Sequence, residues 1–427
     1  MADALKSTIV FMARMTSRTL IQAELKARGI TSVVMSDSVA SCLAALKVDP
    51  LATLILDTDL DEREMVKIMR AAQGQYRIDT RPIYLLAYLL DEKILAYALE
   101  YNVLQLHRGE ISKSQIELNV TDLCRYGQRT ERERETYDLV IKARRAGELQ
   151  KAHVLLEDLY RAEPDNVQGA NELASALCDL DRWHEAQDLL IEIIARFSFD
   201  TRAKHLLARC FMKRADFDKA RYYLEQASVL SPFNVERLCE LAQVLLDDYQ
   251  LSQALGTFQD VLKLDPEVDA ARLGQSQCEL LLGEANDIFT VLRQMQDPFE
   301  FASVFNGAAI VAIRAGHFQQ GIGLYKTAVG HLVEHPSLMS RVFFNMGLGL
   351  HKWGKGKLAI AAFEKAVELD ASNSKAKHNA TQLVISLKRR SRLERNEGPF
   401  SALNSIDTIE DFDELGEENF DASVSRS

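Results

Sequence analysis

The chain has no long apolar run, and no signal peptide is expected at its N-terminus. Its longest apolar runs, such as IYLLAYLL at residues 83–90, are far shorter than the roughly 18–20 residues that a membrane-spanning helix needs. The N-terminal MADALKSTIVF lacks the basic stretch and long apolar core of a signal peptide. The sequence therefore predicts a cytoplasmic protein without a membrane-inserted segment.

The chain also lacks closely spaced cysteines and nucleophile motifs. The wide cysteine spacing predicts reduced, mostly buried thiols and argues against a disulfide framework or a cysteine-based zinc site. No serine lies in a nucleophile-elbow context, and no cysteine and histidine form a known catalytic signature. The sequence predicts a protein that is not an enzyme and that holds no cofactor and no metal. The six cysteines are Cys42, Cys124, Cys178, Cys210, Cys239 and Cys278.

Two short motifs look like functional signatures but lack the necessary context. GLHKWGKG, at residues 349–356, fits the GxxxxGK of a nucleotide-binding loop, but no strand precedes it. HLVEH, at residues 331–335, fits a metalloprotease pattern, but no glutamate follows that could complete a metal site. Both are interpreted as parts of helices and turns.

The formal charge of −11 is concentrated at the C-terminal end. Residues 394–427 contain ten acids and two bases, a net charge of −8, which leaves −3 for the rest of the chain. This near balance does not indicate nucleic-acid binding. The composition of residues 393–427 predicts an acidic, disordered tail. An apolar stripe in it leaves two interpretations open, a solvating segment and a short helix that docks in a groove. The stripe consists of Ile406, Ile409, Phe412 and Leu415.

An alanine recurs at a constant spacing through the middle of the chain, at Ala152, Ala186, Ala220 and Ala254. Twelve residues after each alanine come Pro164, Ser198, Pro232 and Pro266, with the same period. Small residues let two helices approach closely, and proline ends a helix because it lacks an N–H and clashes with the preceding turn. The pattern predicts one pair of packed helices in each period.

These offsets resemble the tetratricopeptide repeat, whose period is about 34 residues. WHEAQDLL, FDKARYYLEQASVLSP and LSQALGTFQDVLKLDP carry the resemblance. It implies an all-α solenoid of about seven repeats and a capping helix over residues 129–392, with a groove that binds proteins or peptides. The first five repeats are expected to begin near Glu133, Val167, Thr201, Val235 and Asp269. The sixth contains GHFQQGIGLYKTAV, the seventh contains GKGKLAIAAFEKAVELD, and SKAKHNATQLVISLKRRSRLER forms the closing helix.

Strands and helices alternate in residues 1–128. Nearly continuous apolar strands predict a parallel sheet that is covered on both faces. The predicted strands are residues 7–12, 31–36, 52–57, 82–88 and 103–107, and the predicted helices are residues 18–30, 38–48, 62–73, 92–101 and 111–127.

The third strand ends in Asp57, within ATLILDTDLDERE at residues 52–64. Five strand–helix units with an aspartate at this place resemble the receiver domain of bacterial response regulators. The resemblance implies a flavodoxin-like α/β fold over residues 1–128 and phosphoryl transfer to Asp57. It also implies an acidic pair that holds Mg²⁺ after the first strand, a Thr or Ser after the fourth, and a Lys after the fifth.

These supporting positions hold other residues, namely Met12-Ala13, Ala87 and His107-Arg108. One carboxylate without a Mg²⁺ cradle is a poor phosphoryl acceptor. Asp57 is therefore interpreted as the remnant of a phospho-acceptor in a pseudo-receiver that is kept for its surface. The alternative is a phosphorelay response regulator in which the acids of the following loop recruit a cation and Asp57 is phosphorylated.

A basic stripe follows one face of the first helix of the third repeat. The tetratricopeptide resemblance places such positions on the inner surface of the solenoid. One interpretation is a groove for an acidic or carboxylate-bearing peptide, and the other is a solvated basic face. The stripe is Arg202, His205, Arg209 and Lys213, and the matching positions of other repeats are Tyr137, Arg144, Gln168, Asn171, Arg341, Phe344 and His351.

The sequence as a whole predicts a non-enzymatic adaptor in bacterial signalling or cell organisation. Its partners are expected to be one or more proteins, such as acidic peptide segments or the small polarity GTPase systems that the resemblance implies. The receiver-like surface would contact one partner and the solenoid groove another.

Overall fold

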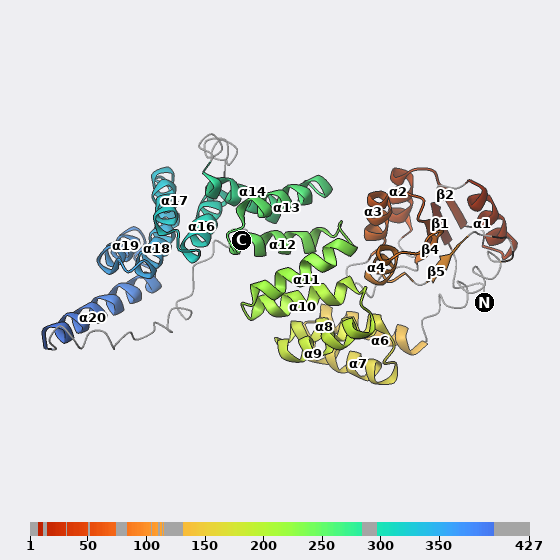
Figure 1. Ribbon diagram of the computed structural model, residues 1–427, viewed down its shortest axis with the longest axis horizontal. Helices are drawn as coiled ribbons and strands as arrows, with labels where there is room; N and C mark the ends of the chain where they lie inside the picture. The colour runs from red at the N-terminus through yellow and green to blue at the C-terminus, as the bar shows by residue number, and fades with distance from the viewer. Residues whose placement is uncertain are drawn as a thin grey trace. The chain divides into compact units, whose positions relative to one another are not determined.

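The computed structural model describes most of the chain as a small α/β domain followed by a long run of helices (Figure 1). By contacts the chain divides into two compact units, residues 1–238 and 239–427, and each is described by itself. The described residues are 7–11, 15–30, 32–49, 52–73, 83–103, 105–109, 112, 114, 131–283 and 297–396. The Met12-Ala13 pair, Cys124, most of the helix predicted at 111–127 and the tail beyond Asn396 lie outside them.

The first unit begins with five parallel strands in the order β2-β1-β3-β4-β5. The register pairs Ile9 with Leu54 and Leu54 with Ile83 across the middle of the sheet. This is the flavodoxin-like doubly wound order, and the predicted α/β fold class is confirmed. The strands are β1 (Ser7–Phe11), β2 (Ser32–Ser36), β3 (Thr53–Asp57), β4 (Ile83–Ala87) and β5 (Gln105–Arg108).

Alternate residues of the central strands form two separate cores. Val10 and Ile55 pack with Ile21 of α1, whereas Ile9 and Leu54 belong to the core that contains residues of α2, α3 and α4. Figure 1 shows α1 on one side of the sheet and α2 and α3 on the other. Because both faces are covered, nearly every residue of β3 and β4 must be apolar. The helices are α1 (Met15–Ala27), α2 (Val39–Val48), α3 (Glu62–Ala72) and α4 (Glu92–Glu100).

The rest of the chain consists of paired helices that begin where the repeat period places them. The helices that begin at Val167, Thr201, Val235 and Asp269 start at the predicted repeat starts. The predicted all-α solenoid is confirmed. Within the described residues, no helix is long and apolar enough to cross a membrane.

The helices that begin in the first unit are α6 (Glu131–Arg145), α7 (Leu149–Ala162), α8 (Val167–Asp179), α9 (Trp183–Arg196), α10 (Thr201–Lys213), α11 (Phe217–Leu230) and α12 (Val235–Asp247). Those of the second unit are α13 (Leu251–Leu264), α14 (Asp269–Leu282), α16 (Pro298–Arg314), α17 (Phe318–His331), α18 (Pro336–Lys352), α19 (Gly356–Leu369) and α20 (Ser374–Asn396).

The turn between the two helices of a repeat requires a left-handed residue. Gly147, Asp181, Ala215, Tyr249 and Gly283 occupy this position in five successive repeats, and their φ angles lie between 56° and 74°. This conformation costs a residue other than glycine about 1–2 kcal/mol. Asp, Ala and Tyr occupy it in three successive repeats, so the packing of the helix pair determines the shape of this turn.

Small residues are needed where the helices of a pair approach most closely. Ala152, Ala186, Ala220 and Ala254 are at most 1% exposed. In the seventh repeat Gly347 takes the small-residue position on the first helix, and a Cβ atom there would lie 2.6 Å from the ring of Phe363. The smaller residue on α18 thus makes room for the larger one on α19.

We expect Gly347→Ala to destabilise the second unit by about 1–3 kcal/mol, because the added methyl overpacks against Phe363. The matched control is Gly323→Ala, at an exposed position of α17 where a Cβ meets no atom within 4 Å. That change should stabilise by up to about 1 kcal/mol, because alanine favours the helix over glycine. Urea unfolding followed by circular dichroism measures the free energy of unfolding of both variants. Equal changes in the two variants would contradict the close packing of Gly347 on Phe363.

Candidate functional site

An asparagine or aspartate precedes the first helix of three successive repeats in the first unit. Asn166, Asp200 and Asn234 occupy the same position of their repeats. Each side chain accepts a hydrogen bond from the backbone N–H three residues later, at 2.9–3.0 Å. These caps satisfy backbone donors that a helix N-terminus leaves unpaired. They also set where the first helices of these repeats begin.

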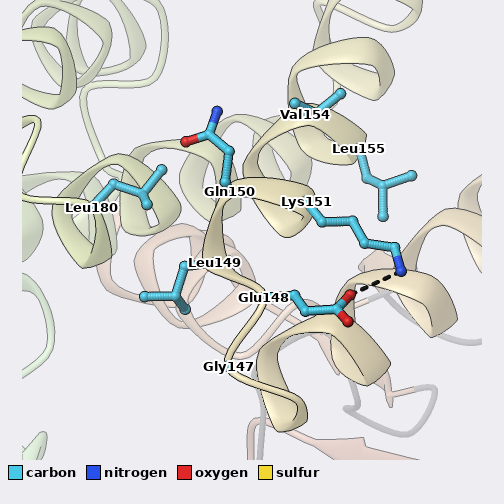
Figure 2. A pocket seen from close by; sticks show the side chains of 8 residues that line it. All are labelled: Gly147, Glu148, Leu149, Gln150, Lys151, Val154, Leu155 and Leu180. Carbon is cyan, nitrogen blue, oxygen red and sulfur yellow. Dashed lines mark hydrogen bonds and ion pairs between the residues drawn. The ribbon is translucent and has the colours of Figure 1, made fainter.

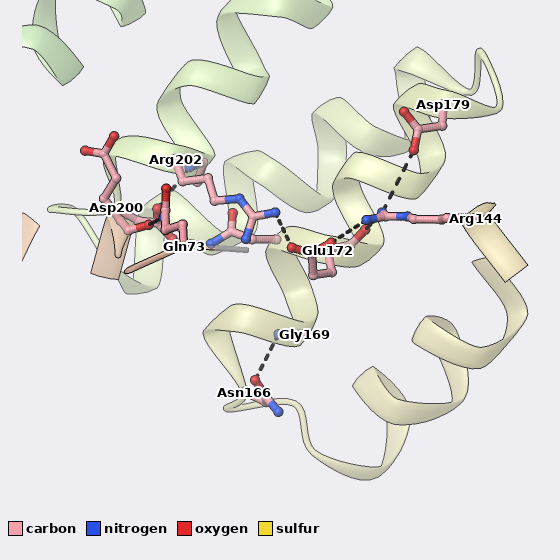
Figure 3. A network of polar contacts seen from close by, with 11 residues as sticks. Gln73, Arg144, Asn166, Gly169, Glu172, Asp179, Asp200 and Arg202 are labelled. Atoms are coloured by element: carbon pink, nitrogen blue, oxygen red, sulfur yellow. Dashed lines mark hydrogen bonds and ion pairs between the residues drawn. The ribbon is translucent and has the colours of Figure 1, made fainter. Parts of the chain in front are cut away.

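Two arginines share one buried carboxylate in the first three repeats. Glu172 of α8 accepts a hydrogen bond from Nη1 of Arg144 at 2.8 Å and another from Nη2 of Arg202. Figure 3 shows the carboxylate between the two guanidinium groups. The side chains of Glu172, Arg202 and Arg144 are 1%, 6% and 10% exposed. The pairing therefore joins α6, α8 and α10 through charges that water hardly reaches.

Burial and charge oppose each other in the titration of these carboxyl groups. Burial by itself would raise the pKa of Glu172, but the charges and hydrogen bonds of Arg202 and Arg144 together lower it. At Asp200 burial is the larger effect, and it raises the pKa of that carboxyl group. The amide of Asn171 donates to Asp200 at 2.6 Å and partly offsets the effect of burial.

A second buried carboxylate comes from the α/β domain. Glu100, the last residue of α4, is 1% exposed and reaches the edge of the solenoid. It accepts hydrogen bonds from the hydroxyl of Thr201 at 3.0 Å and from the amide of Asn234. The guanidinium of Arg237 lies 3.3 and 3.5 Å from its two oxygens and is 0% exposed. We call Thr201, Ser231, Asn234 and Arg237 the Arg237 site.

Apolar and aromatic contacts accompany this ion pair. Helix α4 packs against α10 and α11. The ring of Phe233, next to Asn234, packs against the core formed by the sheet, α2 and α3. The guanidinium of Arg63, on α3, lies 5.6 Å from the centre of that ring. The α/β domain is thus docked on the edge of the third and fourth repeats within the first unit.

The residues predicted to line the groove differ in exposure. Arg144, Asn171 and Arg202 are brought together near Glu172 and Asp200, and each donates a side-chain hydrogen bond to one of these two carboxylates. His205 is 4% exposed, and Tyr137 is 2% exposed within the helix core. Toward the C-terminal end of α10 the basic stripe becomes more exposed, since Arg209 is half-buried and Lys213 is exposed.

In the second unit, Arg341, Phe344 and His351 lie along α18. Phe344 is 1% exposed and packs its ring against Phe363, with ring centres 5.8 Å apart, so it contributes to the core. Arg341 and His351 are half-buried, and burial lowers the pKa of His351. A ligand-binding role for these residues stays a prediction.

Asp57 ends β3 and is completely buried. Beside it on β4, the position expected to hold a Thr or Ser is Ala87, which is 1% exposed. At the end of β5, His107 is half-buried and Arg108 is exposed. Of the following acids, Asp61 caps α3, where it accepts from the backbone of Arg63 at 3.0 Å.

A shallow cavity of about 790 Å³ opens beside the turn between α6 and α7 (Figure 2). The two charged side chains among the residues that line it, Glu148 and Lys151, are paired with each other at 2.8 Å. The remaining lining is mostly apolar, with Leu149, Leu155 and Leu180. This cavity offers no arrangement of polar groups for chemistry.

The sequence reasoning missed Glu172, Asp200, Asn234, Arg237 and Glu100. The caps carry a detectable signal, because an Asn or Asp stands directly before three successive repeat starts. Glu172 is one position beyond a predicted lining residue on the same helix. Glu100 carries no such signal, since its partners are 101–137 residues away in the sequence.

Three segments of the helical part match the tetratricopeptide repeat family, at residues 143–210, 239–287 and 340–373. The period of the sequence, the paired helices of the structure and these three matches all indicate the same repeat. The helical part of the chain is built from tetratricopeptide repeats. Such repeats bind other proteins or peptides, so this part is a protein-binding scaffold. None of the three matches extends into residues 7–109, and the receiver resemblance there stays a prediction.

The chain is also similar to individual proteins over part of its length. The chain is 24% identical over 206 residues to the DnaJ homolog subfamily C member 7 homolog of Schizosaccharomyces pombe. That alignment covers 44% of this chain and 42% of that protein, less than half of its length.

Two solved structures are similar as well. A tetratricopeptide repeat protein from Parabacteroides merdae has 14% identity, covers 60% of this chain and all of its own, and gives a TM-score of 0.42. YrrB, a tetratricopeptide repeat protein with an unusual peptide-binding site, has 13% identity and a TM-score of 0.30. The match covers 52% of this chain and 96% of YrrB.

We expect Glu172→Gln to lower the free energy of unfolding by about 3–5 kcal/mol at neutral pH, because two buried arginines lose their carboxylate. The folded-state pKa of Glu172 is lowered, so its stabilisation is present above the unfolded pKa and is lost as pH falls through the folded pKa. The difference between the two proteins should therefore be constant well above pH 4.5 and shrink below it.

Urea unfolding at a series of pH values measures this difference. The matched control is Glu157→Gln, which breaks an exposed ion pair with Arg161 at 2.6 Å and should change stability by less than about 1 kcal/mol. A Glu172→Gln protein as stable as the wild type at neutral pH would show that the shared carboxylate does not hold these repeats together.

Proposed function

We propose that this protein is a non-enzymatic adaptor in bacterial signalling or cell organisation. Its tetratricopeptide repeats bind one or more partner proteins, with acidic peptide segments or the components of a small polarity GTPase system as candidates. The flavodoxin-like domain is a phosphorylation-incompetent pseudo-receiver over residues 1–128 that supplies a second contact surface. The repeats and capping helix occupy residues 129–392, and residues 393–427 form an acidic tail.

The observation that carries this proposal is the family match of the repeats, which places protein binding in the helical part. The burial of Asp57 supports the pseudo-receiver, because a carboxylate with no exposed area offers an incoming phosphoryl donor no line of attack. Ala87 supports it further, since a methyl group cannot donate a hydrogen bond to a transferring phosphoryl oxygen. Asp61, already engaged as a helix cap, is a poor cation ligand.

The alternative is a phosphorelay response regulator with the repeats as its output. It is favoured by one observation, the position of Asp57 at the carboxyl end of the central strand β3, where ligands of open α/β sheets bind.

The two candidates differ in their response to acetyl phosphate and Mg²⁺. We expect no phosphoryl adduct on Asp57 by intact mass spectrometry, and we expect Asp57→Asn to bind the same partners as the wild type in an affinity capture from cell extract. Asp57→Asn also serves as the labelling control, because it removes the acceptor. A stable adduct on the wild type that is absent from Asp57→Asn would establish the phosphorelay regulator instead.

A further inference from the structure

The ion pair between Glu100 and Arg237 is longer than a well-formed guanidinium–carboxylate pair. Good guanidinium–carboxylate pairs have donor–acceptor distances of about 2.7–2.9 Å. Arg144 and Glu172 meet this standard at 2.8 Å, whereas Arg237 lies 3.3 and 3.5 Å from the oxygens of Glu100. Of the two buried carboxylates that pair with arginines, the one that links two domains therefore lies farther from its arginine.

The guanidinium of Arg237 also keeps an unused donor. Its Nη2 donates to the carbonyl of Ser231 at 2.6 Å, but its buried Nε has no hydrogen-bond partner among the described residues. A carboxylate can accept two parallel hydrogen bonds from one guanidinium. Glu100 leaves this donor of Arg237 unpaired, as Glu172 leaves the Nε of Arg144.

The position of Glu100 in its own helix indicates that it is there for the docking contact. It is the last residue of α4, where the helix dipole places partial negative charge. A carboxylate at this end opposes the dipole, and burial adds a desolvation cost. Neither effect stabilises the α/β domain by itself, whereas the contacts with Thr201, Asn234 and Arg237 favour the buried carboxylate.

We propose that the Arg237 site is a carboxylate receptor for an acidic segment of a partner protein, and that Glu100 occupies it in the absence of that partner. The partner's carboxylate would take the place of Glu100 on Thr201, Asn234 and Arg237. An apolar residue beside it would pack on Phe233, which the α/β domain now covers. Binding then displaces the α/β domain from the repeats and frees its α3–α4 surface.

This inference rests on the proposed adaptor function and goes further, because it names the site and the ligand chemistry. In this proposal, binding of a partner at the Arg237 site and exposure of the α3–α4 surface depend on each other. A ligand that competes with a segment of the same chain binds with an apparent affinity reduced by the fraction of open molecules. Loosening the docked domain must therefore tighten the binding of an acidic ligand.

The experiment measures the affinity of a fluorescein-labelled peptide with the sequence of residues 400–421, which carries eight acids, no base and several apolar residues. Fluorescence anisotropy is recorded with the wild type and with Glu100→Gln, which keeps the side-chain shape and removes the charge. We expect Glu100→Gln to bind the peptide about tenfold more tightly or better. The same peptide with every Asp and Glu changed to Asn and Gln should bind neither protein.

Two further variants separate this site from a general loss of structure. Glu172→Gln removes a buried carboxylate that also pairs with arginines but does not link the two domains, and it should raise peptide affinity by a much smaller factor than Glu100→Gln does. Arg63→Ala removes an exposed contact with Phe233 and should raise the affinity in the same direction by a smaller factor. Each measurement is repeated on a chain ending at Asn396, which retains every described residue and removes competition by its own tail.

Equal peptide affinity of the wild type and Glu100→Gln in the chain ending at Asn396 would overturn the proposal. Equal gains from Glu172→Gln and Glu100→Gln would overturn it as well, because they would locate the binding elsewhere. Either result would leave the adaptor function standing, since partner capture and phosphoryl labelling test that separately.

Discussion

An arginine that is buried among helices must keep a carboxylate partner, and this requirement organises the first unit of the protein. Removing either partner of a buried ion pair leaves an uncompensated charge that costs several kcal/mol. Arg202 and Arg144 meet the requirement within the solenoid through Glu172, whereas Arg237 meets it through Glu100 of another domain. The same constraint therefore makes one junction a fixed part of the repeats and the other a link between domains.

The difference between the two junctions matters for a scaffold. Glu172 lies on a helix that is packed between its neighbours, so its pairing with Arg144 and Arg202 is lost only when the repeats unfold. Glu100 is carried by a domain that has two cores of its own, and the proposed exchange requires this domain to leave the repeats without unfolding. In a tetratricopeptide repeat array, the same arginine–carboxylate pairing can thus stabilise the fold at Glu172 and form the proposed binding site at Arg237.

Most of the fold could be predicted from the sequence, because its signals are local and periodic. The regular spacing of small residues located the starts of four helices to the residue, and the apolar strands of the first domain indicated the parallel sheet. The burial of the groove candidates could not be predicted this way. Helical spacing places Arg202 and His205 on one face but does not show what covers that face, and here both are at most 6% exposed.

By itself the sequence determined the repeat architecture and the strand–helix alternation. Each of these depends on residue types at short, regular spacing. Only the tertiary structure decided that Glu100 meets Arg237, because the two are 137 residues apart and belong to different domains. Long-range pairing of charges follows from how the domains pack, and no periodicity within either segment encodes it.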